Sequence, residues 1–541
     1  MQTLKPHCFV FFVAAVSVVA VAATGRRTAA DDRSPNVLIA ISDDQSWPHA
    51  SAYGSKMVKT PNFDRVAREG VLFTNAFSPS PGCSPSRASF LTGLHTWQLE
   101  HAGTHASYFD QRFATFPDQL TRGGYYVGYT GKGWGPGNWR KLGRQTNPAG
   151  PVFQPASQDD KRMGRYAGAF ANFLRQRPAD KPFCFWFGSS DPHRGYAKAS
   201  GLQKGKRLAD AEVPAFLPDT PEIRGDMLDY AFEVERFDDD LGKILKLLEQ
   251  TGELDNTLVI VTSDNGIPIP RAKANCYEWG IHMPLAIRWG QARAGRTVDD
   301  LVGFVDLTAT IYDATGVDRP AGVKLVGRGI ANLLTSSKSG IVDPRRDAVY
   351  SARERHSSSR YNSLSYPQRC IRTQDYLYIR NFKPERWPAG PAQKLQSAKY
   401  NADGSLATSK LGPPYGGFHD IDACPTLDFL IANRADPKIK PFLDLSVAKR
   451  PAEELYDIRT DSGCLRNLAD DQDHERVKRQ LNERLMGELR RTGDPRASGN
   501  GDVWETYPRV SRLRWFPTPD WAKQNPDSAP TQEWLDERRP Q

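Results

Sequence analysis

Three long apolar stretches restrict the fold of this chain more than any other feature. They read NVLIAISDDQ at 36–45, KPFCFWFGSSDPHR at 181–194 and NTLVIVTSDNG at 256–266, and each passes from an unbroken apolar run into polar side chains. A strand with one solvated face alternates apolar and polar residues, whereas a strand buried on both faces is apolar throughout. The three stretches therefore predict central strands of a sheet that is covered on both sides.

Helical periodicity fills the intervals between these strands. It is clearest from 222 to 250, where apolar side chains recur every three or four residues. Alternating strands and helices predict an α/β fold with a doubly wound, mainly parallel sheet and helices on both faces. The acids Asp238, Asp239 and Asp240 of this helix are expected to face solvent.

The character of the sequence changes near residue 345, where short apolar pieces replace the long ones. RCIRTQDYLYIRNF at 369–382 predicts a hairpin, and the Pro-, Gly- and Ser-rich stretch 383–420 predicts loops. A chain of 541 residues suits one large domain and a smaller one. We expect a signal peptide at 1–30, a large α/β domain at 31–365, an α+β subdomain at 366–500, and a tail at 501–541 that wraps over the surface.

The N-terminus has the layout of a cleaved signal peptide. Lys5 precedes the apolar run 8–23, and small residues follow that run. An uncleaved anchor is the alternative, but sixteen residues are short for a bilayer span. The sequence therefore predicts export to a periplasmic, secreted or lysosome-like compartment, without a stable membrane anchor.

The charge and the cysteines restrict the partners and the covalent framework. Loss of the first thirty residues lowers the formal net charge from +9 to +6, an excess that favours a polyanionic partner. No nucleic-acid motif accompanies it, so nucleic acid is not an expected partner. Apart from Cys8, six cysteines are scattered without CxxC pairs, which predicts no disulfide framework and leaves one or two bridges open.

Polar side chains follow each predicted central strand and should meet at one edge of the sheet. They are Asp43 and Asp44, Asp191 and His193, and Asp264 and Asn265. Adjacent carboxylates repel each other unless a cation lies between them, and a hard divalent ion with oxygen ligands, Ca²⁺ or Mg²⁺, would resolve this. Asp43 and Asp44 could instead cap a following helix, but the matching Asp-Asn pair favours the metal.

Three cations add fixed positive charge to this edge. Arg87, Lys132 and Lys273 would each be read as a surface residue if considered alone. Together with a metal they describe a pocket for a tetrahedral oxyanion ester. Cys83 lies four residues before Arg87, in CSPSR.

The segment CSPSR followed by ASFLTG resembles the C-x-P-S-R motif of the type I sulfatases. Further motifs agree in order over about residues 35–470: the early DD, TGK, DPHR, TSDNG, K-x-x-x-Y-E and ELYDIRTDSGCLRNLAD. The resemblance implies an alkaline-phosphatase-like fold, with a mixed doubly wound sheet and a smaller C-terminal α+β domain. Within the family, LSYPQR and RNFKP are similar to segments of the heparan N-sulfatases.

The resemblance also implies a chemistry for Cys83. In this family a maturation enzyme oxidises the cysteine to formylglycine, and one hydroxyl of its hydrate attacks sulfur. The second hydroxyl then expels sulfate, which a serine could not do. By the same resemblance one Ca²⁺ per subunit lies beside the modified Cys83, Arg87 stabilises the hydrate, Lys132 and Lys273 clamp sulfate, and His193 protonates the leaving group. The implied metal ligands are Asp43, Asp44, Asp264, Asn265 and the modified Cys83.

Two positions depart from the family pattern. Trp134 stands where sulfatases usually place a histidine, so His49, His101 or His105 is a candidate replacement. The indole of Trp134, which cannot accept a proton, is expected to form a pocket wall or stack on a sugar; burial in the core is the alternative. Lys273 stands where the N-sulfatases carry arginine.

These observations predict a sulfatase that acts on a sulfated glycan, with N-sulfoglucosamine as the leading substrate. An O-sulfatase and a phosphate or phosphonate ester hydrolase on the same scaffold are alternatives. A glycan-binding pseudoenzyme, suggested by Trp134, is a third. The expected partners are a sulfated saccharide and the formylglycine-generating enzyme, and the oligomeric state stays open, a dimer included.

Overall fold

The computed structural model describes residues 34–401, 406–511 and 513–520. The predicted signal peptide at 1–30 lies outside these residues. Among the described helices, none combines the length and the apolar character that crossing a bilayer requires.

A mixed sheet of eight strands forms the centre of the larger part, in the order β3-β4-β1-β5-β6-β2-β7 with β8 paired to β2. The strands β3, β4, β1 and β5 are mutually parallel, and β6 is antiparallel to its neighbours. The predicted doubly wound sheet is therefore confirmed. Its strands are β1 (Asn36–Ser42), β2 (Val71–Phe77), β3 (Tyr126–Gly131), β4 (Phe183–Gly188), β5 (Thr257–Ser263), β6 (His282–Arg288), β7 (Arg296–Val298) and β8 (Val302–Gly303).

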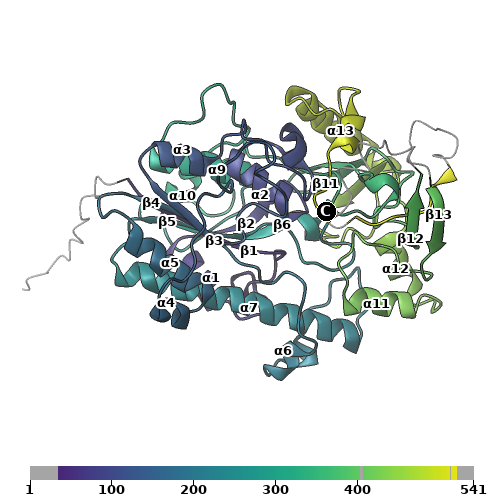
Figure 1. Cartoon of the computed structure of the whole chain (residues 1–541), viewed down its shortest axis with the longest axis horizontal. Coiled ribbons are helices and arrows are strands. Elements are labelled where there is room, and N and C mark those ends of the chain that lie inside the picture. Colours follow the sequence, from purple (N-terminus) through teal and green to yellow (C-terminus); the bar gives the residue numbers. More distant parts are fainter. Residues whose placement is uncertain (1–33, 402–405, 512, 521–541) are drawn as a thin grey trace, which may run out of the picture. The chain divides into compact units, whose positions relative to one another are not determined.

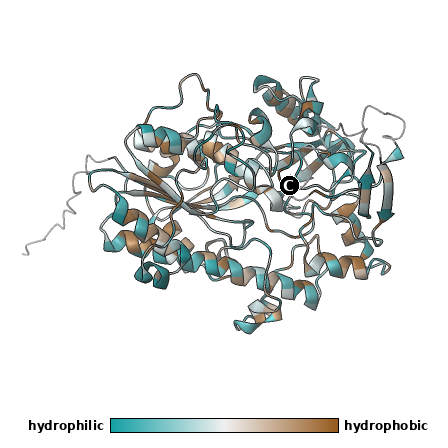
Figure 2. Cartoon of the chain, viewed as in Figure 1, coloured by the Kyte–Doolittle hydropathy of each residue, from teal (hydrophilic) through white to brown (hydrophobic). Residues whose placement is uncertain are grey.

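Strand β1 shows why the central strands are continuously apolar. Val37, Ile39 and Ile41 point into a hydrophobic cluster on one face of the sheet, and Leu38 and Ala40 point into a second cluster on the other. All five are fully buried. Figure 2 shows the same distribution, with brown strands between helices that are teal on their outer sides.

Helices cover both faces of this sheet (Figure 1). One group packs on the cluster that contains Leu38: α1 (Pro61–Glu69), α5 (Arg165–Gln176) and α7 (Pro221–Gln250). The opposite group is α2 (Cys83–Thr92), α3 (Phe116–Arg122), α9 (Phe304–Thr315) and α10 (Ala331–Thr335). Three short helices complete this part: α4 (Gln158–Met163), α6 (Ser200–Gln203) and α8 (Glu278–Ile281). The helix predicted at 222–250 is thus confirmed as α7.

One prediction about α7 is wrong. Asp238 is buried rather than solvated. Its carboxylate accepts hydrogen bonds from the backbone N–H groups of Asn62 and Phe63, at 3.0 and 2.7 Å, at the start of α1. Burial raises the pKa of Asp238 to about 6. A single-helix periodicity could not reveal this, because the partner of Asp238 belongs to another helix.

The smaller part is built on a four-stranded antiparallel sheet of order β14-β11-β10-β9. Its strands are β9 (Val349–Arg353), β10 (Gln368–Arg372), β11 (Tyr376–Asn381) and β14 (Glu453–Asp457), and α13 (Glu475–Arg491) packs on one face. The hairpin predicted at 369–382 is confirmed by the pairing of β10 with β11. This sheet, with β9 beginning at Val349, matches the expected smaller C-terminal α+β part, while the limits of the four proposed regions stay predictions.

The stretch 383–420 is less irregular than the sequence suggested. β12 (Leu395–Tyr400) and β13 (Leu406–Leu411) form an antiparallel pair, followed by α11 (Pro425–Ala432) and α12 (Lys440–Val447). The Pro and Gly content predicted the turns but not the pairing of the strands between them.

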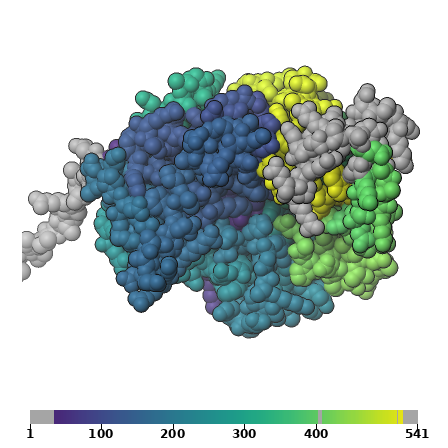
Figure 3. All heavy atoms as spheres, viewed as in Figure 1, coloured from purple at the N-terminus to yellow at the C-terminus, as the bar shows by residue number. Residues whose placement is uncertain are grey.

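The described part of the C-terminal tail packs back on the rest of the chain. Trp504 and Phe516 are buried, and the backbone N–H of Val510 donates to the carbonyl of Ala106 at 2.8 Å. In Figure 3 the yellow end of the described chain, which includes α13, lies against the blue-purple first part of the sequence. It thereby covers the segment that follows α2.

Candidate active site

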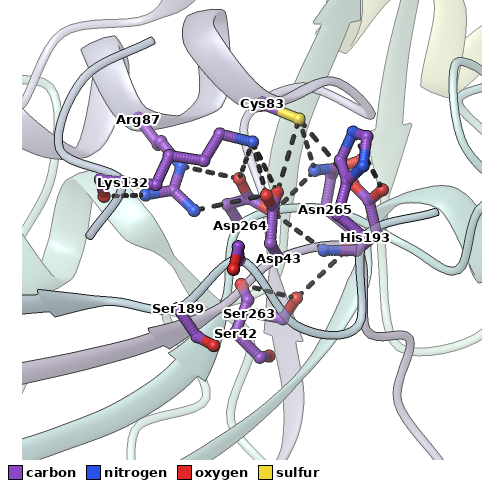
Figure 4. A network of polar contacts seen from close by, with 12 residues as sticks. Ser42, Asp43, Cys83, Arg87, Lys132, Ser189, His193, Ser263, Asp264 and Asn265 are labelled. Atoms are coloured by element: carbon purple, nitrogen blue, oxygen red, sulfur yellow. Dashed lines mark hydrogen bonds and ion pairs between the residues drawn. The ribbon is translucent and has the colours of Figure 1, made fainter. Parts of the chain in front are cut away.

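The site forms where four parallel strands end at one level. Ser42 at the end of β1 pairs with Ser263 at the end of β5. Gly131 at the end of β3 pairs with Gly188 at the end of β4. The residues just beyond these ends therefore emerge side by side, and Figure 4 shows Asp43, Lys132 and Asp264 converging. The strand register thus brings the polar side chains together at the carboxyl edge of the sheet, as expected.

Two glycines permit the close approach of β3 and β4 at this edge. A Cβ on Gly188 would lie 1.8 Å from the carbonyl oxygen of Lys132, and a Cβ on Gly131 would lie 2.0 Å from the carbonyl oxygen of Gly188. The backbone N–H of Lys132 donates to that same Gly188 oxygen at 2.8 Å. A side chain at either position would therefore push Lys132 away.

Helix α2 begins at Cys83 and aims its thiol at the strand ends. Sγ lies 3.6 Å from Oδ1 of Asp43, 3.7 Å from Oδ1 of Asp44 and 3.6 Å from Nδ2 of Asn265. The hydroxyl of Ser86 donates to the carbonyl of Asp264 at 2.6 Å and fixes the first turn. The thiol is buried, and this burial raises its pKa well above the usual value.

Arg87 lies one turn further along α2 and links two strand ends. Its Nε donates to Oδ2 of Asp264 at 2.7 Å, and its NH1 donates to the carbonyl of Lys132 at 2.6 Å. Its NH2 lies 3.8 Å from Oδ1 of Asp43. The guanidinium is buried, and although burial lowers its pKa, Asp264 and Asp43 raise it further.

Lys132 and Asp43 form a close ion pair of the site. Nζ of Lys132 lies 2.6 Å from both carboxylate oxygens of Asp43. Burial would raise the pKa of Asp43, but Lys132 lowers it below its usual range. The carboxylate is therefore ionised in the folded chain.

The donor set around Cys83 fits a hard divalent cation. Ligand atoms of Asp43, Asp44, Cys83 and Asp264 all lie within 4.8 Å of one another. Oδ1 of Asn265 is buried and meets no hydrogen-bond donor among the described residues. Three carboxylates and a carbonyl oxygen that lacks a donor are ligands that Ca²⁺ or Mg²⁺ accepts.

The alternative role for Asp43 and Asp44, as caps of a following helix, is wrong. The next element is the short 3-10 helix η1 (Ser51–Tyr53), and its N-cap is Ala50. Asp44 instead adopts φ of 75°, and its backbone N–H donates to Oδ1 of Asp264 at 3.1 Å. The two carboxylates are held at the site by the backbone itself.

Lys273 and His193 lie on the other side of Asp44. Nζ of Lys273 is 2.6 Å from Oδ2 of Asp44, and Nε2 of His193 is 3.8 Å from the same oxygen. Burial lowers the pKa of Lys273, but Asp422 and Asp44 raise it well above the usual value. His193 is partly exposed, so it faces the solvent side of the site.

Asp422 belongs to the site and was missed in the sequence. Its Oδ2 lies 2.9 Å from Nζ of Lys273, across 149 positions of the chain. It lies in FHDIDACP, just after the stretch that predicted loops, and no motif or periodicity marked it. Burial opposes its ionisation, but Lys273 and His356 hold the pKa of Asp422 well below its usual range.

The three candidate histidines lie in different surroundings. His49 is buried between Tyr230 and Trp279, and burial lowers its pKa to about 3. His101 packs against Tyr507 of the tail. The ring of His49 hydrogen-bonds to Tyr230, and that of His101 hydrogen-bonds to Ser107.

His105 lies nearest to the start of α2. Its ring faces that of His356, with centroids 4.7 Å apart, and a Cβ on Gly82 would lie 4.0 Å from His105 and 3.3 Å from His356. Arg509 of the tail donates to the carbonyl of His356 at 2.6 Å. This buried pair lies beside the residue that precedes Cys83, and His356 carried no signal in the sequence.

Trp134 is buried in the core, although it also lies among the residues that line the open cleft beside Lys132. It is 3% exposed, and its ring packs edge-on against Phe109. Its indole N–H donates to the carbonyl of Ser84 at 3.0 Å. Trp134 thus supports the first turn of α2, and its small exposed fraction leaves little surface on which a sugar could stack.

An open cleft of about 650 Å³ leads to these groups. Asp43, Lys132, Asp191, His193 and Arg194 are among the residues that line it. The cleft can admit a ligand larger than a single sulfate. All six cysteines in the described part are free, buried thiols. Cys83 differs from the others in that its Sγ lies 3.6 Å from Oδ1 of Asp43.

The cluster has the parts needed to transfer a charged tetrahedral group. The buried cations can neutralise its oxygens, the acidic and amide oxygens can hold a metal, and the partly exposed histidine can exchange a proton with a leaving group. The residues predicted for these tasks all meet here: Asp43, Asp44, Cys83, Arg87, Lys132, His193, Asp264, Asn265 and Lys273.

Comparisons with known proteins agree with this geometry. The family model described as Sulfatase matches residues 35–317. The chain is similar to the N-sulphoglucosamine sulphohydrolase of Homo sapiens, with 29% identity over 393 residues that cover 64% of this chain and 74% of that protein. It is also similar to the N-acetylglucosamine-6-O-sulfatase of Bacteroides thetaiotaomicron, with 26% identity over 451 residues that cover 64% of this chain and 79% of that protein.

A solved structure shares the fold. It is described as a complex with its substrate D-glucosamine-2-N,6-O-disulfate, and it matches with a TM-score of 0.59 and 20% identity. The match covers 86% of this chain and 99% of the other. The main sheet and the smaller C-terminal sheet therefore form one architecture that both proteins have.

Proposed function

We propose that this chain, which belongs to the sulfatase family, releases sulfate from a sulfated saccharide and that an N-sulfated glucosamine unit is its leading substrate. The observation that carries the proposal is the position of Cys83. Its Sγ lies at the N-terminus of α2, within 3.7 Å of side-chain atoms of Asp43, Asp44 and Asn265. A buried neutral thiol is a weak nucleophile, so this placement favours a modified side chain.

Formylglycine at position 83 would supply a hydrate with two hydroxyl groups, one to attack sulfur and one to expel sulfate. Arg87 lies one turn away and would stabilise the ionised hydrate. Lys132 and Lys273, each bound to one of the paired carboxylates, would bind the sulfate oxygens. His193 would give a proton to the departing atom.

The metal in this proposal is one Ca²⁺ per subunit. Asp43, Asp44, Asp264 and Asn265 would hold it beside residue 83, and Oδ1 of Asn265 supports this because it lacks a donor among the described residues. A bound divalent cation would lower the pKa of the attacking hydroxyl and neutralise charge on sulfate. Arg87 keeps Asp264 oriented for that task through its 2.7 Å hydrogen bond.

The proton acceptor for the second hydroxyl is proposed to be the pair of His105 and His356. Both rings lie against Gly82, whereas Trp134 occupies the usual histidine position as a core residue. Burial, and then His356 and Arg509, lower the pKa of His105 well below its usual value. His105 is therefore neutral near pH 7, and the same surroundings make it a weaker base than a free imidazole.

The cellular setting of the proposal follows from the N-terminal sequence. The run 8–23 between Lys5 and small residues supports export with cleavage. The proposed partners are a sulfated saccharide and a formylglycine-generating enzyme. The oligomeric state is left open.

The test is a panel of defined saccharides with protein produced alongside the maturation enzyme. Glucosamine N-sulfate, N-acetylglucosamine 6-O-sulfate and N-acetylgalactosamine 6-sulfate are incubated with the enzyme, and released sulfate is quantified by ion chromatography. We expect release, fastest from the N-sulfate, and none by Cys83→Ala. Phosphate monoesters and phosphonates serve as competing substrates. Turnover of these in preference to every sulfate would contradict the proposal.

The same preparation tests the modification. Mass spectrometry of the peptide that contains Cys83 is expected to show an aldehyde in place of the thiol. Cys83→Ala should keep the thermal midpoint of the wild type, because Cys83 lies at the rim of the sheet and α2 keeps its contacts through Ser86 and Arg87. Full activity with an unmodified thiol would refute the covalent mechanism.

A further inference from the structure

Asp422 brings a negative charge to the edge of a site that must receive an anion. Its carboxylate comes from the loop before α11, and its Oδ2 lies 2.9 Å from Nζ of Lys273. The same ammonium group lies 2.6 Å from Oδ2 of Asp44. Lys273 is thus held between two carboxylates, and only that of Asp44 belongs to the proposed metal ligands.

Asp422 lies in a cluster with Asp44 and His193. One ligand atom each of Asp44, His193 and Asp422 lies within 4.8 Å of the others. The side chain of Asp422 is 28% exposed and that of His193 is 40% exposed, whereas that of Asp44 is fully buried. Asp422 and His193 therefore lie on the side that a ligand can reach.

A second metal ion does not explain this cluster. Asp44 is already a proposed ligand of the Ca²⁺, so the cluster leaves one carboxylate and one histidine, fewer ligands than a second hard cation takes. Charge pairing with Lys273 does not explain the position of Asp422 either, because Asp44 already gives that lysine a buried partner. The exposed part of the Asp422 carboxylate remains able to accept a hydrogen bond.

The leaving atom of the substrate determines whether the Asp422 carboxylate favours or disfavours binding. The nitrogen of a sulfamate carries a hydrogen that can be donated to a carboxylate, whereas the bridging oxygen of a sulfate ester carries none and would be repelled. On cleavage the S–N bond breaks, its electron pair stays on nitrogen, and His193 supplies the proton that completes the amine. That amine takes up a further proton from water and becomes an ammonium, which a neighbouring carboxylate attracts.

We infer that Asp422 is a specificity-determining residue that selects an N–H leaving group, and hence N-sulfated amino sugars over O-sulfated ones. The inference rests on the proposed function and extends it to a residue outside the matched part of the family model, which ends at 317. Asp422 accepts the N–H of the bound sulfamate while His193 protonates the departing nitrogen. Lys273 keeps the carboxylate in place and neutralises its effect on the sulfate group.

Asp422→Asn tests the inference because it keeps the shape and removes the charge. The variant, the wild type and Asp428→Asn, an exposed carboxylate six residues away, are assayed on glucosamine N-sulfate and N-acetylglucosamine 6-O-sulfate. We expect kcat/KM of Asp422→Asn for the N-sulfate to fall about tenfold or more. Its kcat/KM for the 6-O-sulfate should fall by a clearly smaller factor or rise, and Asp428→Asn should match the wild type.

Glucosamine, the amine product, gives a second readout in the same proteins. It should inhibit the wild type and inhibit Asp422→Asn about tenfold more weakly, because the ammonium loses its carboxylate partner. Glucose, which lacks the amine, should not distinguish the two proteins. A thermal midpoint for each variant confirms that it is folded.

The outcomes separate this inference from the proposed function. Equal losses on both substrates would reduce Asp422 to a positioning residue for Lys273 and overturn the inference. So would a wild type that cleaves O-sulfates and leaves the N-sulfate intact, although such an enzyme would still be a sulfatase. A wild type that releases no sulfate from any substrate would overturn the proposed function and the inference together.

Discussion

The side chains around Cys83 divide into those that would meet the metal and those that hold them in place. Asn265 belongs to the first kind, since its Oδ1 finds no donor among the described residues. Asp264 belongs to both, because it lies near Cys83 and also binds Arg87 at 2.7 Å. Removing Asp264 would therefore leave a buried arginine unpaired as well as weaken the metal site.

Asn265→Ala is the cleaner test of the metal. Added Ca²⁺ should raise the thermal midpoint of the wild type, since a ligand that binds only the folded state stabilises it by about 2.7 kcal/mol at a hundred times its Kd. The variant should lose most of this rise. Differential scanning calorimetry with EDTA and with Ca²⁺ measures it, and Asn433→Ala, at the end of α11, serves as control. An undiminished rise in Asn265→Ala would exclude Oδ1 as a ligand.

Trp134 acts on the reaction through α2. Trp134→Phe keeps a large ring and removes the hydrogen bond to the Ser84 carbonyl, so we expect a stability loss of about 1 kcal/mol and a lower kcat with KM nearly unchanged. Trp134→Ala should cost about 3–5 kcal/mol because it leaves a cavity. Trp134→His should not improve turnover.

Urea unfolding and steady-state kinetics separate these effects. Trp139→Phe, at a half-buried tryptophan five positions away, is the matched control. A large rise in KM for Trp134→Phe, with stability intact, would return the indole to the substrate site.

At the scale of elements, the ends of the strands determine where the charges lie. Strands β3 and β4 approach each other at Gly131 and Gly188, and the backbone of Lys132 depends on that approach. The ladder between β1 and β5 similarly brings Asp43 level with Asp264. The positions of the cations and acids are therefore properties of strand register.

Gly188→Ala should disturb this register. Its Cβ would lie 1.8 Å from the carbonyl oxygen of Lys132, so we expect a loss of stability of about 1–3 kcal/mol or more and a fall in kcat/KM for sulfate release. Gly225→Ala, in α7 where a Cβ would meet nothing within 4 Å, should instead gain up to about 1 kcal/mol. Wild-type kcat/KM in Gly188→Ala would show that Lys132 does not depend on the close contact.

At the scale of the whole molecule, the two sheets share a buried junction. Arg372 of β10 donates from Nε and NH2 to both carboxylate oxygens of Glu278 in α8, at 2.9 and 3.0 Å. Glu278 also contacts His282 at 2.9 Å. This junction lies a few residues from Lys273, so it fixes the smaller sheet relative to the site.

We expect the stability that this junction contributes to decrease at low pH. Burial would raise the pKa of Glu278, but Arg372 and His282 lower it to about 2. Because this pKa lies below the unfolded value, the stabilisation is complete above about pH 4.5 and is lost as the pH falls towards 2. Glu278→Gln should be less stable by about 3–5 kcal/mol at pH 7, and the gap to the wild type should narrow as the pH falls through that range.

Thermal midpoints measured from pH 7 to pH 3 test this dependence. Glu483→Gln, at an exposed carboxylate of α13, should follow the wild type at every pH. A gap that is the same at pH 7 and pH 3 would mean that the charge of Glu278 does not stabilise the junction.

The sequence alone was sufficient for the central strands, for α7 and for the residues that follow the strands. An apolar run such as 36–42 needs two covered faces wherever it lies, and the acids after it must emerge at the carboxyl edge. The motif around Cys83 could likewise be recognised because its residues are adjacent in the sequence. These are properties of short segments, and short segments can be interpreted without knowing their neighbours.

Only the tertiary structure assigned the residues whose meaning depends on a distant partner. Asp422 joins the site through Lys273, 149 positions away, and His356 joins through its contact with His105. Asp238 looks like a surface residue until the start of α1 is placed beside it, and the support that Trp134 gives to α2 is visible only in its bond to Ser84. The periodicity of a sequence indicates which side chains of one helix or strand are buried. A hydrogen bond or an ion pair between distant segments depends instead on the packing of the entire chain.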